Sequence, residues 1–338
     1  MGIFRILITT CFRSRIALAC LTIAATGAAE QARAQTSVDV EMAILIDTSG
    51  SVLTSGTLDR VLNGHMALFR DPRLMPFLQR QGIQSLAVSA FAFGTETAER
   101  TLVRQLTTWQ TIRTASDARA FAAAVDASRA VANIGGRTPI GDAVVLTGFG
   151  NTRPDLTTAR LEAASILGGV TPTGLLNNGI TATRASGPRV FLNLVSDGAD
   201  FPTTPPGMDV FDAGDDTRAA GVNVINAIAT QPTLTPFAQD ILQNLITKDP
   251  SLPNPPGLDG FIQVPLSTSD ADFFEAACRK FARELLLGTP AAGASCEMLF
   301  GRRNVIPRTE RRANERERLA GRRPSVTDVA VSPGQEVP

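Results

Sequence analysis

The sequence has few of the side chains on which most nucleophilic and general-base chemistry depends. Its 338 residues include one histidine, His65, no tyrosine, and lysine only at Lys248 and Lys280. A Ser-His-Asp triad, a paired-histidine zinc site or a histidine general base would therefore have to use His65. Because His65 falls within an amphipathic helical pattern, we predict a half-buried structural role for it. Two lysines also leave little scope for Schiff-base chemistry.

Long apolar segments are scarce as well. Arginines precede an apolar run at residues 16–29, and small residues surround Ala34, which is the pattern of a secretory signal peptide. We expect cleavage after Ala34. No later segment approaches the roughly 20 apolar residues that a membrane span needs. The sequence therefore predicts a secreted or periplasmic protein with no transmembrane segment after removal of the signal peptide.

Cysteine is limited to four positions, and only Cys278 and Cys296 follow the predicted signal peptide. In an oxidising compartment these two could form one disulfide. Two unpaired buried thiols are the alternative, because the geometry of a disulfide cannot be read from sequence. Beyond this region the composition changes: residues 301–323 are rich in arginine with few apolar residues, so we expect a mobile tail.

A strand that ends in a cluster of oxygen-bearing side chains is the strongest local signal in the chain. Residues 38–46 begin with alternating apolar and acidic positions and continue as an apolar run, which is typical of a strand in a buried parallel sheet. Asp47 follows at once, with Ser49 and Ser51 at alternate positions. Three such oxygens can converge on one point, and hard oxygen ligands suit Mg²⁺ or Mn²⁺. The same residues could instead cap a helix expected at 52–69.

Two further segments bring polar side chains to the same predicted edge of the sheet. Residues 189–196 have the pattern of another buried strand, and Asp197 follows them, so we expect Asp197 on the same sheet edge as Asp47. Thr138 lies in a glycine-rich loop that opens into a helix, and its hydroxyl would face the same crevice. Thr138 also suits the cap of that helix, with Pro139 in its first turn.

The rest of the chain alternates between strand and helix patterns, and 43% hydrophobic residues are enough for a sizeable core. Strands are predicted over 85–93, 101–106, 221–228 and 261–265, and helices over 52–69, from Ser116 past Val131, and over 217–220, 237–247 and 270–287. The segments 168–188 and 201–216 lack periodicity and are predicted as loops. The second is acidic and is either solvated or a rim of the site.

Three motifs, taken together, resemble those of a von Willebrand factor type A domain with a complete metal-ion-dependent adhesion site. They are Asp47-x-Ser49-x-Ser51, Thr138 within GGRTPIGDA, and Asp197-Gly198 after a hydrophobic strand. The resemblance covers about residues 38–290 and extends to secreted bacterial members of this family. It implies an α/β fold: a doubly wound, mostly parallel, Rossmann-like sheet with one antiparallel edge strand and helices on both faces. The expected organisation is a signal peptide over 1–34, the domain over 35–292 and an arginine-rich tail over 293–338.

The resemblance also implies roles for the five site residues. Ser49 and Ser51 would coordinate the ion directly, Thr138 directly or through water, and Asp47 and Asp197 partly through water. A partner's Asp or Glu carboxylate would complete the shell of Mg²⁺ or Mn²⁺. The implied protein is a binding module for a protein partner and not an enzyme, and no basic groove for nucleic acid is evident. The alternatives are a metal-dependent hydrolase using the same ion and a scaffold in envelope assembly.

Overall fold

The computed structural model describes most of residues 36–285. The described residues are 36–97, 100–153, 156–185, 189–197, 210–230, 245, 261–263 and 269–285. All of them belong to one unit of the chain, Met1–Phe300, and a second unit, Gly301–Pro338, lies outside them. The predicted signal peptide, arginine-rich tail and helix 237–247, apart from Leu245, also lie outside the described residues.

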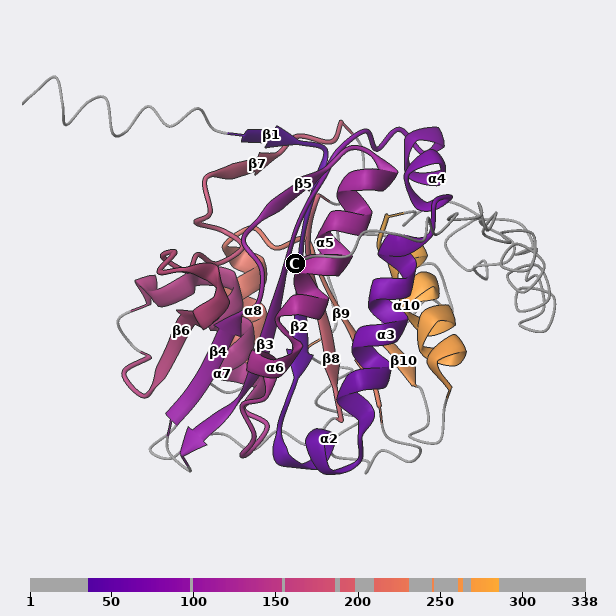
Figure 1. The fold of residues 1–338 in the computed structure, drawn as a ribbon. Coiled ribbons are helices and arrows are strands. Elements are labelled where there is room, and N and C mark those ends of the chain that lie inside the picture. Colours follow the sequence, from indigo (N-terminus) through magenta and orange to yellow (C-terminus); the bar gives the residue numbers. More distant parts are fainter. Residues whose placement is uncertain are drawn as a thin grey trace, which may run out of the picture. The chain divides into compact units, whose positions relative to one another are not determined.

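An eight-stranded sheet with the order β10-β9-β8-β2-β3-β4-β6 forms the centre of the domain, and β5 pairs with β3 off this path (Figure 1). The strands are β2 Val40–Asp47, β3 Leu86–Thr97, β4 Arg100–Gln105, β5 Gln110–Ile112, β6 Ala159–Ala163, β8 Val190–Ser196, β9 Val224–Ala229 and β10 Phe261–Gln263. The pairs of β2 with β3 and of β2 with β8 are parallel, as are β8 with β9 and β9 with β10. A separate two-stranded sheet joins β1 Thr36–Val38 to β7 Ile180–Ala182. The predicted mostly parallel α/β sheet is confirmed.

The position of the antiparallel strand differs from the prediction. β4 runs antiparallel to β3, but β6 pairs in parallel with β4, so β4 lies inside the sheet and β6 follows it in the strand order. The sequence of β6, ARLEA, mixes small and charged residues and gives no clear strand period. The strands β1, β5 and β7 have three residues each and escaped prediction for the same reason.

Helices cover both faces of the sheet (Figure 1). They are α2 Gly50–Thr54, α3 Thr57–Arg70, α4 Leu74–Arg80, α5 Ala115–Ala127, α6 Arg129–Ala132, α7 Ile140–Phe149, α8 Val210–Ala219 and α10 Asp270–Leu285. Residues of α3, α5 and α10 share one buried cluster with the sheet, and residues of α7 and α8 share the other. No helix within the described ranges is both long enough and apolar enough to cross a membrane.

Three helix predictions need correction. The predicted helix 52–69 is two helices, α2 and α3, because Gly56 adopts a left-handed conformation with φ of 66° between them. The helix predicted from Ser116 begins one residue earlier, at Ala115, because Thr114 is its N-cap and forms a capping box with Asp117. The described part of the predicted acidic loop, from Val210, is the helix α8.

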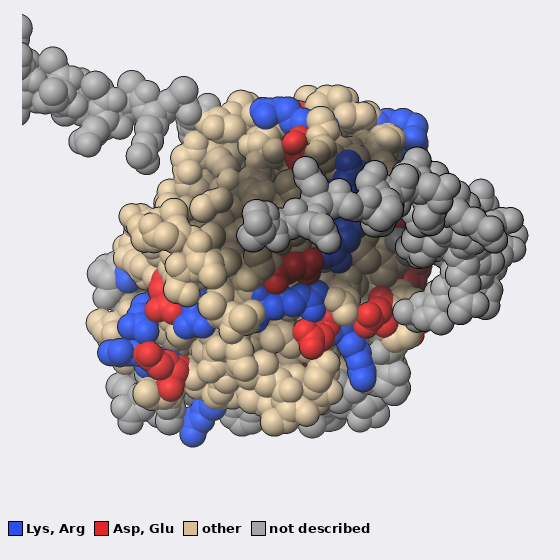
Figure 2. Space-filling view, viewed as in Figure 1, with Lys and Arg blue, Asp and Glu red and all other residues tan. Residues whose placement is uncertain are grey.

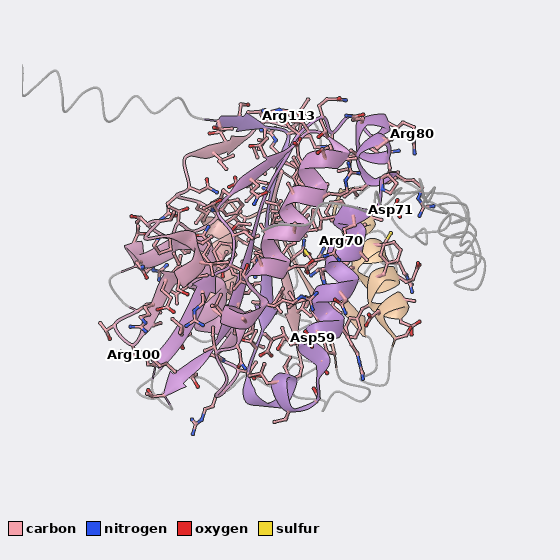
Figure 3. All side chains as sticks on the ribbon, viewed as in Figure 1. Asp59, Arg70, Asp71, Arg80, Arg100 and Arg113 are labelled. Atoms are coloured by element: carbon pink, nitrogen blue, oxygen red, sulfur yellow. The ribbon has the colours of Figure 1, made fainter. Side chains whose placement is uncertain are left out.

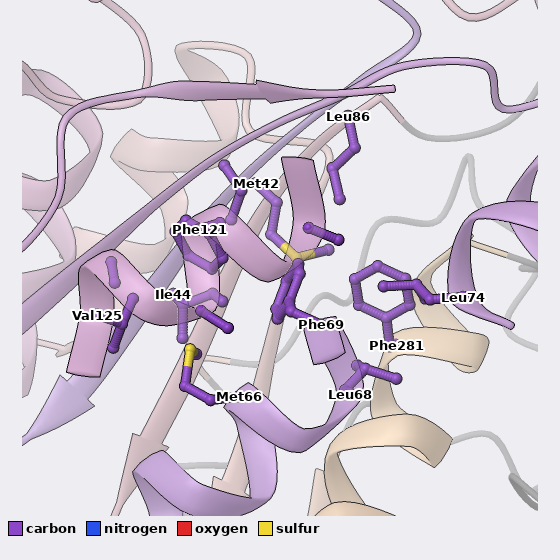
Figure 4. Close-up of a cluster of buried hydrophobic side chains, with 14 of the residues drawn as sticks. Met42, Ile44, Met66, Leu68, Phe69, Leu74, Leu86, Phe121, Val125 and Phe281 are labelled. Atoms are coloured by element: carbon purple, nitrogen blue, oxygen red, sulfur yellow. The ribbon is translucent and has the colours of Figure 1, made fainter. Parts of the chain in front are cut away.

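The larger core cluster lies between the sheet and the helices α3, α5 and α10 (Figure 4). β2 alternates, so that Met42 and Ile44 face this cluster while Ala43 and Leu45 face the other one. Phe69 of α3 contacts two aromatic rings edge-on, with centroid distances of 4.8 Å to Phe121 of α5 and 6.1 Å to Phe281 of α10. Phe69 therefore joins three helices through aromatic contacts of a favourable geometry.

The helices α3 and α10 approach each other at Gly64. A Cβ atom at this position would lie 2.5 Å from the Cβ of Phe273, so only glycine allows the contact. The next residue, His65, is buried and not half-buried as predicted, and its Nδ1 lies 2.9 Å from the carbonyl oxygen of Val61. Its predicted structural role agrees with this place in the core. Lys280 of α10 is also buried and donates to the carbonyl oxygen of Leu194, at 2.9 Å.

Cys278 of α10 is buried and disulfide-bonded. Cys296, its predicted partner, lies outside the described residues. The Cys278–Cys296 pairing therefore stays a prediction.

Charges of both signs are mixed over the surface. On the face shown in Figure 2, basic and acidic side chains alternate and form no broad area of one sign. Ion pairs join α3 to the neighbouring helices α5 and α6: Arg70 pairs with Asp126, and Asp59 lies 3.0 Å from Arg129. Figure 3 labels Arg70 and Asp59 on α3. These exposed pairs contribute little to stability individually.

The outer edge of β6 is covered by one side chain. Asn151 donates its Nδ2 to the carbonyl oxygen of Leu161 at 2.7 Å and accepts from the Leu161 N–H at 2.7 Å. Its amide thereby takes the place of a neighbouring strand. Edge strands with free N–H and C=O groups are templates for association, so Asn151 protects this edge.

Replacing Asn151 tests that role. We expect Asn151→Ala to lower the free energy of unfolding by about 1–2 kcal/mol, because two backbone groups lose their partners. Denaturant unfolding measures this loss, and sedimentation velocity is expected to reveal added self-association. Asn133→Ala, at an exposed position, is the control. Equal stability and equal sedimentation of the two variants would contradict the protective role.

Candidate metal site

The candidate site lies where the chain order of the sheet reverses. From β2 the chain builds outward through β3 and β4, and it then returns to place β8 on the other side of β2. Ligands in open α/β sheets bind at such switch points, outside the carboxyl ends of the strands. Asp47 ends β2 and Asp197 follows the last residue of β8, so the two predicted carboxylates lie at neighbouring strand ends. In Figure 1 this edge is at the bottom, beside α2.

Asp47 organises the turn that follows β2. It is buried, and its Oδ1 accepts from the N–H of Ser49 at 2.8 Å, while its Oδ2 accepts from the hydroxyl of Ser196 at 2.7 Å. The backbone N–H of Asp197 lies 3.4 Å from the same Oδ2. One carboxylate therefore links the end of β2 to the end of β8.

The serine side chains of the turn do not cap the following helix. Ser49 is the N-cap residue of α2, but it makes no side-chain cap hydrogen bond. Its hydroxyl lies 3.2 Å from the hydroxyl of Ser51, and Ser51 donates to Oδ2 of Asp197. The hydroxyls thus point toward the end of the neighbouring strand β8 and do not cap α2.

Asp197 has an unusual environment for a buried carboxylate. It is 4% exposed, and while its Oδ2 accepts from Ser51, its Oδ1 is buried and has no hydrogen-bond partner among the described residues. A buried carboxylate oxygen without a partner is costly. The chemistry that fits this oxygen best is a cation at the same strand edge.

The loop that carries Thr138 is bound to the Asp47 turn through the backbone. Gly135 donates its N–H to the carbonyl of Thr48 at 2.9 Å, and the carbonyl of Gly136 accepts from the N–H of Gly50 at 2.9 Å. Both loop glycines have positive φ, and a Cβ at residue 136 would lie 2.2 Å from Oγ1 of Thr95. Glycine is therefore required for the approach of this loop to the turn.

Thr138 does not cap α7, contrary to one of the two readings of the sequence. The N-cap position is Pro139, which makes no side-chain cap hydrogen bond. Thr138 is 3% exposed and follows directly on the loop that binds the Asp47 turn. The structure therefore brings all five predicted residues to the same group of loops, four of them through side-chain hydrogen bonds.

Two hydroxyl residues of the site were missed from the sequence. Ser196 donates to Asp47, and Thr95 accepts from the backbone N–H of Arg137 at 2.8 Å. Ser196 precedes Asp197 directly, and a hydroxyl at the last position of a strand beside the motif was the available signal. Thr95 gave no local signal, because its role depends on the pairing of β3 with the glycine loop.

The electrostatics of the site favour a bound cation. Burial, and then the negative charge of Asp197, raise the pKa of Asp47 to about 7, and hydrogen bonds from Ser49 and Ser196 oppose the rise. The negative charge of Asp197 disfavours the ionised form of Asp47 unless a positive charge lies between them. A divalent cation at this edge would supply that charge and favour the ionised form of Asp47.

The donor types decide which ions fit. Within the described ranges there is no group of three or more His, Cys, Asp or Glu residues that could hold a metal. A metal at this edge would therefore be bound through serine and threonine hydroxyls together with Asp47 and Asp197. Hard oxygen donors of this kind suit Mg²⁺ or Mn²⁺ better than ions that prefer sulfur or imidazole.

The family model described as Protein of unknown function (DUF1194) matches residues 37–152, about a third of the chain. No curated protein matches the sequence.

Solved structures that match are von Willebrand factor type A domains and related matrix and adhesin proteins. Proximal thread matrix protein 1 from the mussel byssus, with a zinc-occupied MIDAS motif, matches with 15% identity and a TM-score of 0.40 over 75% of this chain and 49% of that one. Von Willebrand factor type A from Catenulispora acidiphila matches with 15% identity and a TM-score of 0.38 over 72% of this chain and 43% of that one. The pilus adhesin SpaC from Lactobacillus rhamnosus GG matches with 10% identity and a TM-score of 0.41 over 73% of this chain and 31% of that one. The chain thus spans about half or less of the length of these proteins.

Proposed function

We propose that this domain is a binding module that holds a divalent cation, Mg²⁺ or Mn²⁺, and through it captures a carboxylate of a protein partner. The residues that would hold the ion are Asp47, Ser49, Ser51, Thr138 and Asp197. The ion supplies a positive centre to which an Asp or Glu side chain of the partner can bind.

The observation that carries the proposal is the unpaired oxygen of Asp197. Its Oδ1 is buried without a hydrogen-bond partner in the part of the chain that the structure describes, while its Oδ2 is linked through Ser51 to Ser49. A row of a carboxylate and two hydroxyls, with one oxygen unsatisfied, has the donor chemistry of a hard-cation site.

Exposure indicates the side from which a partner would approach. Ser51 is exposed, whereas Asp47, Ser49 and Thr138 are buried. The buried residues would fix the ion, and the partner's carboxylate would reach it from the side of Ser51. Secretion or export to the periplasm belongs to the same proposal, because it rests on the signal peptide predicted over residues 1–34.

Metal binding is tested most directly with Ser51→Ala. We expect Mg²⁺ to raise the melting temperature of the wild-type protein, because a ligand that binds only the folded state stabilises it. We expect Ser51→Ala and Asp197→Asn to weaken Mg²⁺ binding by at least about 10-fold, as metal-site changes commonly do. Isothermal titration calorimetry with Mg²⁺ and Mn²⁺ gives the affinities, and Zn²⁺ is included as a softer ion.

The matched control is Ser55→Ala. Ser55 follows the same short helix, and its hydroxyl bonds to the carbonyl of Val52 and to Thr57. This variant should bind Mg²⁺ like the wild type. A wild-type protein whose melting temperature is unchanged by all three ions would refute the proposal, as would equal affinities for Ser51→Ala and the wild type.

A metal-dependent hydrolase, the alternative function, could not use His65 as a base at this site. His65 is buried in α3, and its Nδ1 is 2.9 Å from the carbonyl of Val61. Burial and the charge of Lys280 lower its pKa to about 4. The position and the hydrogen bond of His65 fit a core residue between α3 and α10.

A further inference from the structure

Arg137 lies directly beside the proposed ligand Thr138 on a backbone that is held firmly. Its N–H donates to Oγ1 of Thr95 at 2.8 Å, and the preceding Gly136 accepts from Gly50 at 2.9 Å. These bonds anchor residue 137 to β3 on one side and to the turn that carries Ser51 on the other. The Arg137 side chain is exposed. An arginine whose backbone is fixed loses less freedom on binding than one on a free loop.

The net charge of the site with its ion bound gives a positively charged side chain nearby a role. A divalent ion carries two positive charges, and Asp47 and Asp197 carry two negative charges when ionised, so the loaded site is close to neutral. A neutral site still attracts one carboxylate that contacts the ion. It provides little additional attraction for a segment that carries several acidic residues. The charge of Arg137 changes this balance, because it makes the loaded edge positive.

The acid that follows the Arg137 anchor Thr95 along β3 is already paired. Glu96 follows Thr95 on β3, and its carboxylate lies 3.6 Å from Arg100 and 3.1 Å from Arg160. Among the ion pairs of the described residues, none includes Arg137. Its guanidinium therefore remains available for a group that comes from outside the chain.

We propose that Arg137 is a specificity-determining residue that selects acidic segments with two carboxylates. One carboxylate would bind the cation, and Arg137 would bind the neighbouring one through its planar fork of donors. This inference rests on the proposed function, because it assigns a second contact to the same ligand. The partner it fits is a peptide segment with adjacent acidic residues.

The test compares two short peptides of equal length, one with an Asp-Asp pair and one with Asp-Asn, in saturating Mg²⁺ and at constant ionic strength. The wild-type protein is expected to bind the Asp-Asp peptide about 3- to 10-fold more tightly. Arg137→Gln should reduce this ratio to about one while its affinity for Mg²⁺ alone is unchanged. Arg137→Lys should keep part of the preference for the Asp-Asp peptide, because lysine keeps the charge but lacks the planar guanidinium donors.

The control is Arg113→Gln. Arg113 is also exposed, and it lies at the end of the molecule away from α2 (Figures 1 and 3). This variant should keep the full preference. An equal preference in Arg137→Gln and the wild type would overturn the inference and leave the metal site intact. A wild-type protein that fails to bind Mg²⁺ would overturn both the inference and the proposed function.

Discussion

At pH 8 the Glu41→Gln variant is expected to be about 3 kcal/mol more stable than the wild-type protein. Glu41 lies on β2, is 3% exposed, and accepts a hydrogen bond from Asn178. Burial raises the pKa of Glu41 from 4.5 to about 7, although the Asn178 bond opposes the rise. At pH 8 folding therefore buries an ionised carboxylate. The difference of about 2.5 pKa units corresponds to about 3 kcal/mol, and neutral glutamine removes this cost while keeping an acceptor for Asn178.

The pH dependence identifies the cause. The folded state binds the Glu41 proton more tightly than the unfolded state, so the wild-type protein gains stability as the pH falls from about 7 to 4.5. The advantage of Glu41→Gln should therefore fade over this range and vanish near pH 4. Denaturant unfolding at several pH values measures the effect, with exposed Glu96→Gln as the control. Parallel stability profiles for Glu41→Gln and the wild type would contradict the expectation.

His65 should produce the opposite dependence. Its burial, and then the charge of Lys280, lower the pKa of His65 from 6.5 to about 4. The unfolded state binds this proton more tightly, so the wild-type protein loses stability as the pH falls from 6.5 to 4, by about 3 kcal/mol. We expect His65→Gln to remove this loss, so that its stability relative to the wild type increases on acidification.

One measurement reads the histidine directly. Because the chain has a single histidine, an NMR titration gives one imidazole signal, which is expected to stay unprotonated down to about pH 4. Gln79→Ala, at the exposed end of α4, is the control for the unfolding experiments. An imidazole that titrates near 6.5 would show that His65 is not buried as described. A stability difference between His65→Gln and the wild type that is independent of pH would show that the proton plays no part.

The two effects have opposite signs over nearly the same interval of pH. In the wild-type protein the gain from Glu41 and the loss from His65 therefore offset each other between about pH 4.5 and 6.5. The raised pKa of Asp47 adds a gain on acidification of the same sign as that of Glu41, so the two variants are compared with the wild type and not with a flat line. Relative to the wild type, Glu41→Gln should lose stability on acidification and His65→Gln should gain it.

The sequence was sufficient to place the main strands and the two carboxylates. β2, β3, β8 and β9 have long apolar runs, and a parallel pairing brings their carboxyl ends to one edge. That rule places Asp197 on the same sheet edge as Asp47, and the pairing of β8 with β2 makes them neighbours, as the bond from Ser51 to Asp197 shows.

What the sequence could not supply depends on contacts between distant segments. The segment 168–188 was predicted as a surface loop, yet Asn178 within it holds the buried Glu41, and β7 pairs with β1. Thr138 has the local chemistry of a helix cap, but the bonds of Gly135 and Gly136 to the Asp47 turn fix where α7 begins. His65 is more deeply buried than its helix pattern indicates, because Gly64 lets α10 approach.

The contact at Gly64 also bears on how the chain is made. Phe273 packs on Gly64 and Phe281 on Phe69, so the helix that covers one side of the sheet is separated by roughly 200 residues from the helix that receives it. Until α10 emerges, the apolar side of β2 that carries Met42 and Ile44 lacks part of its cover. A chain whose synthesis pauses before residue 270 is therefore expected to expose part of this apolar surface until the last described helix packs on it.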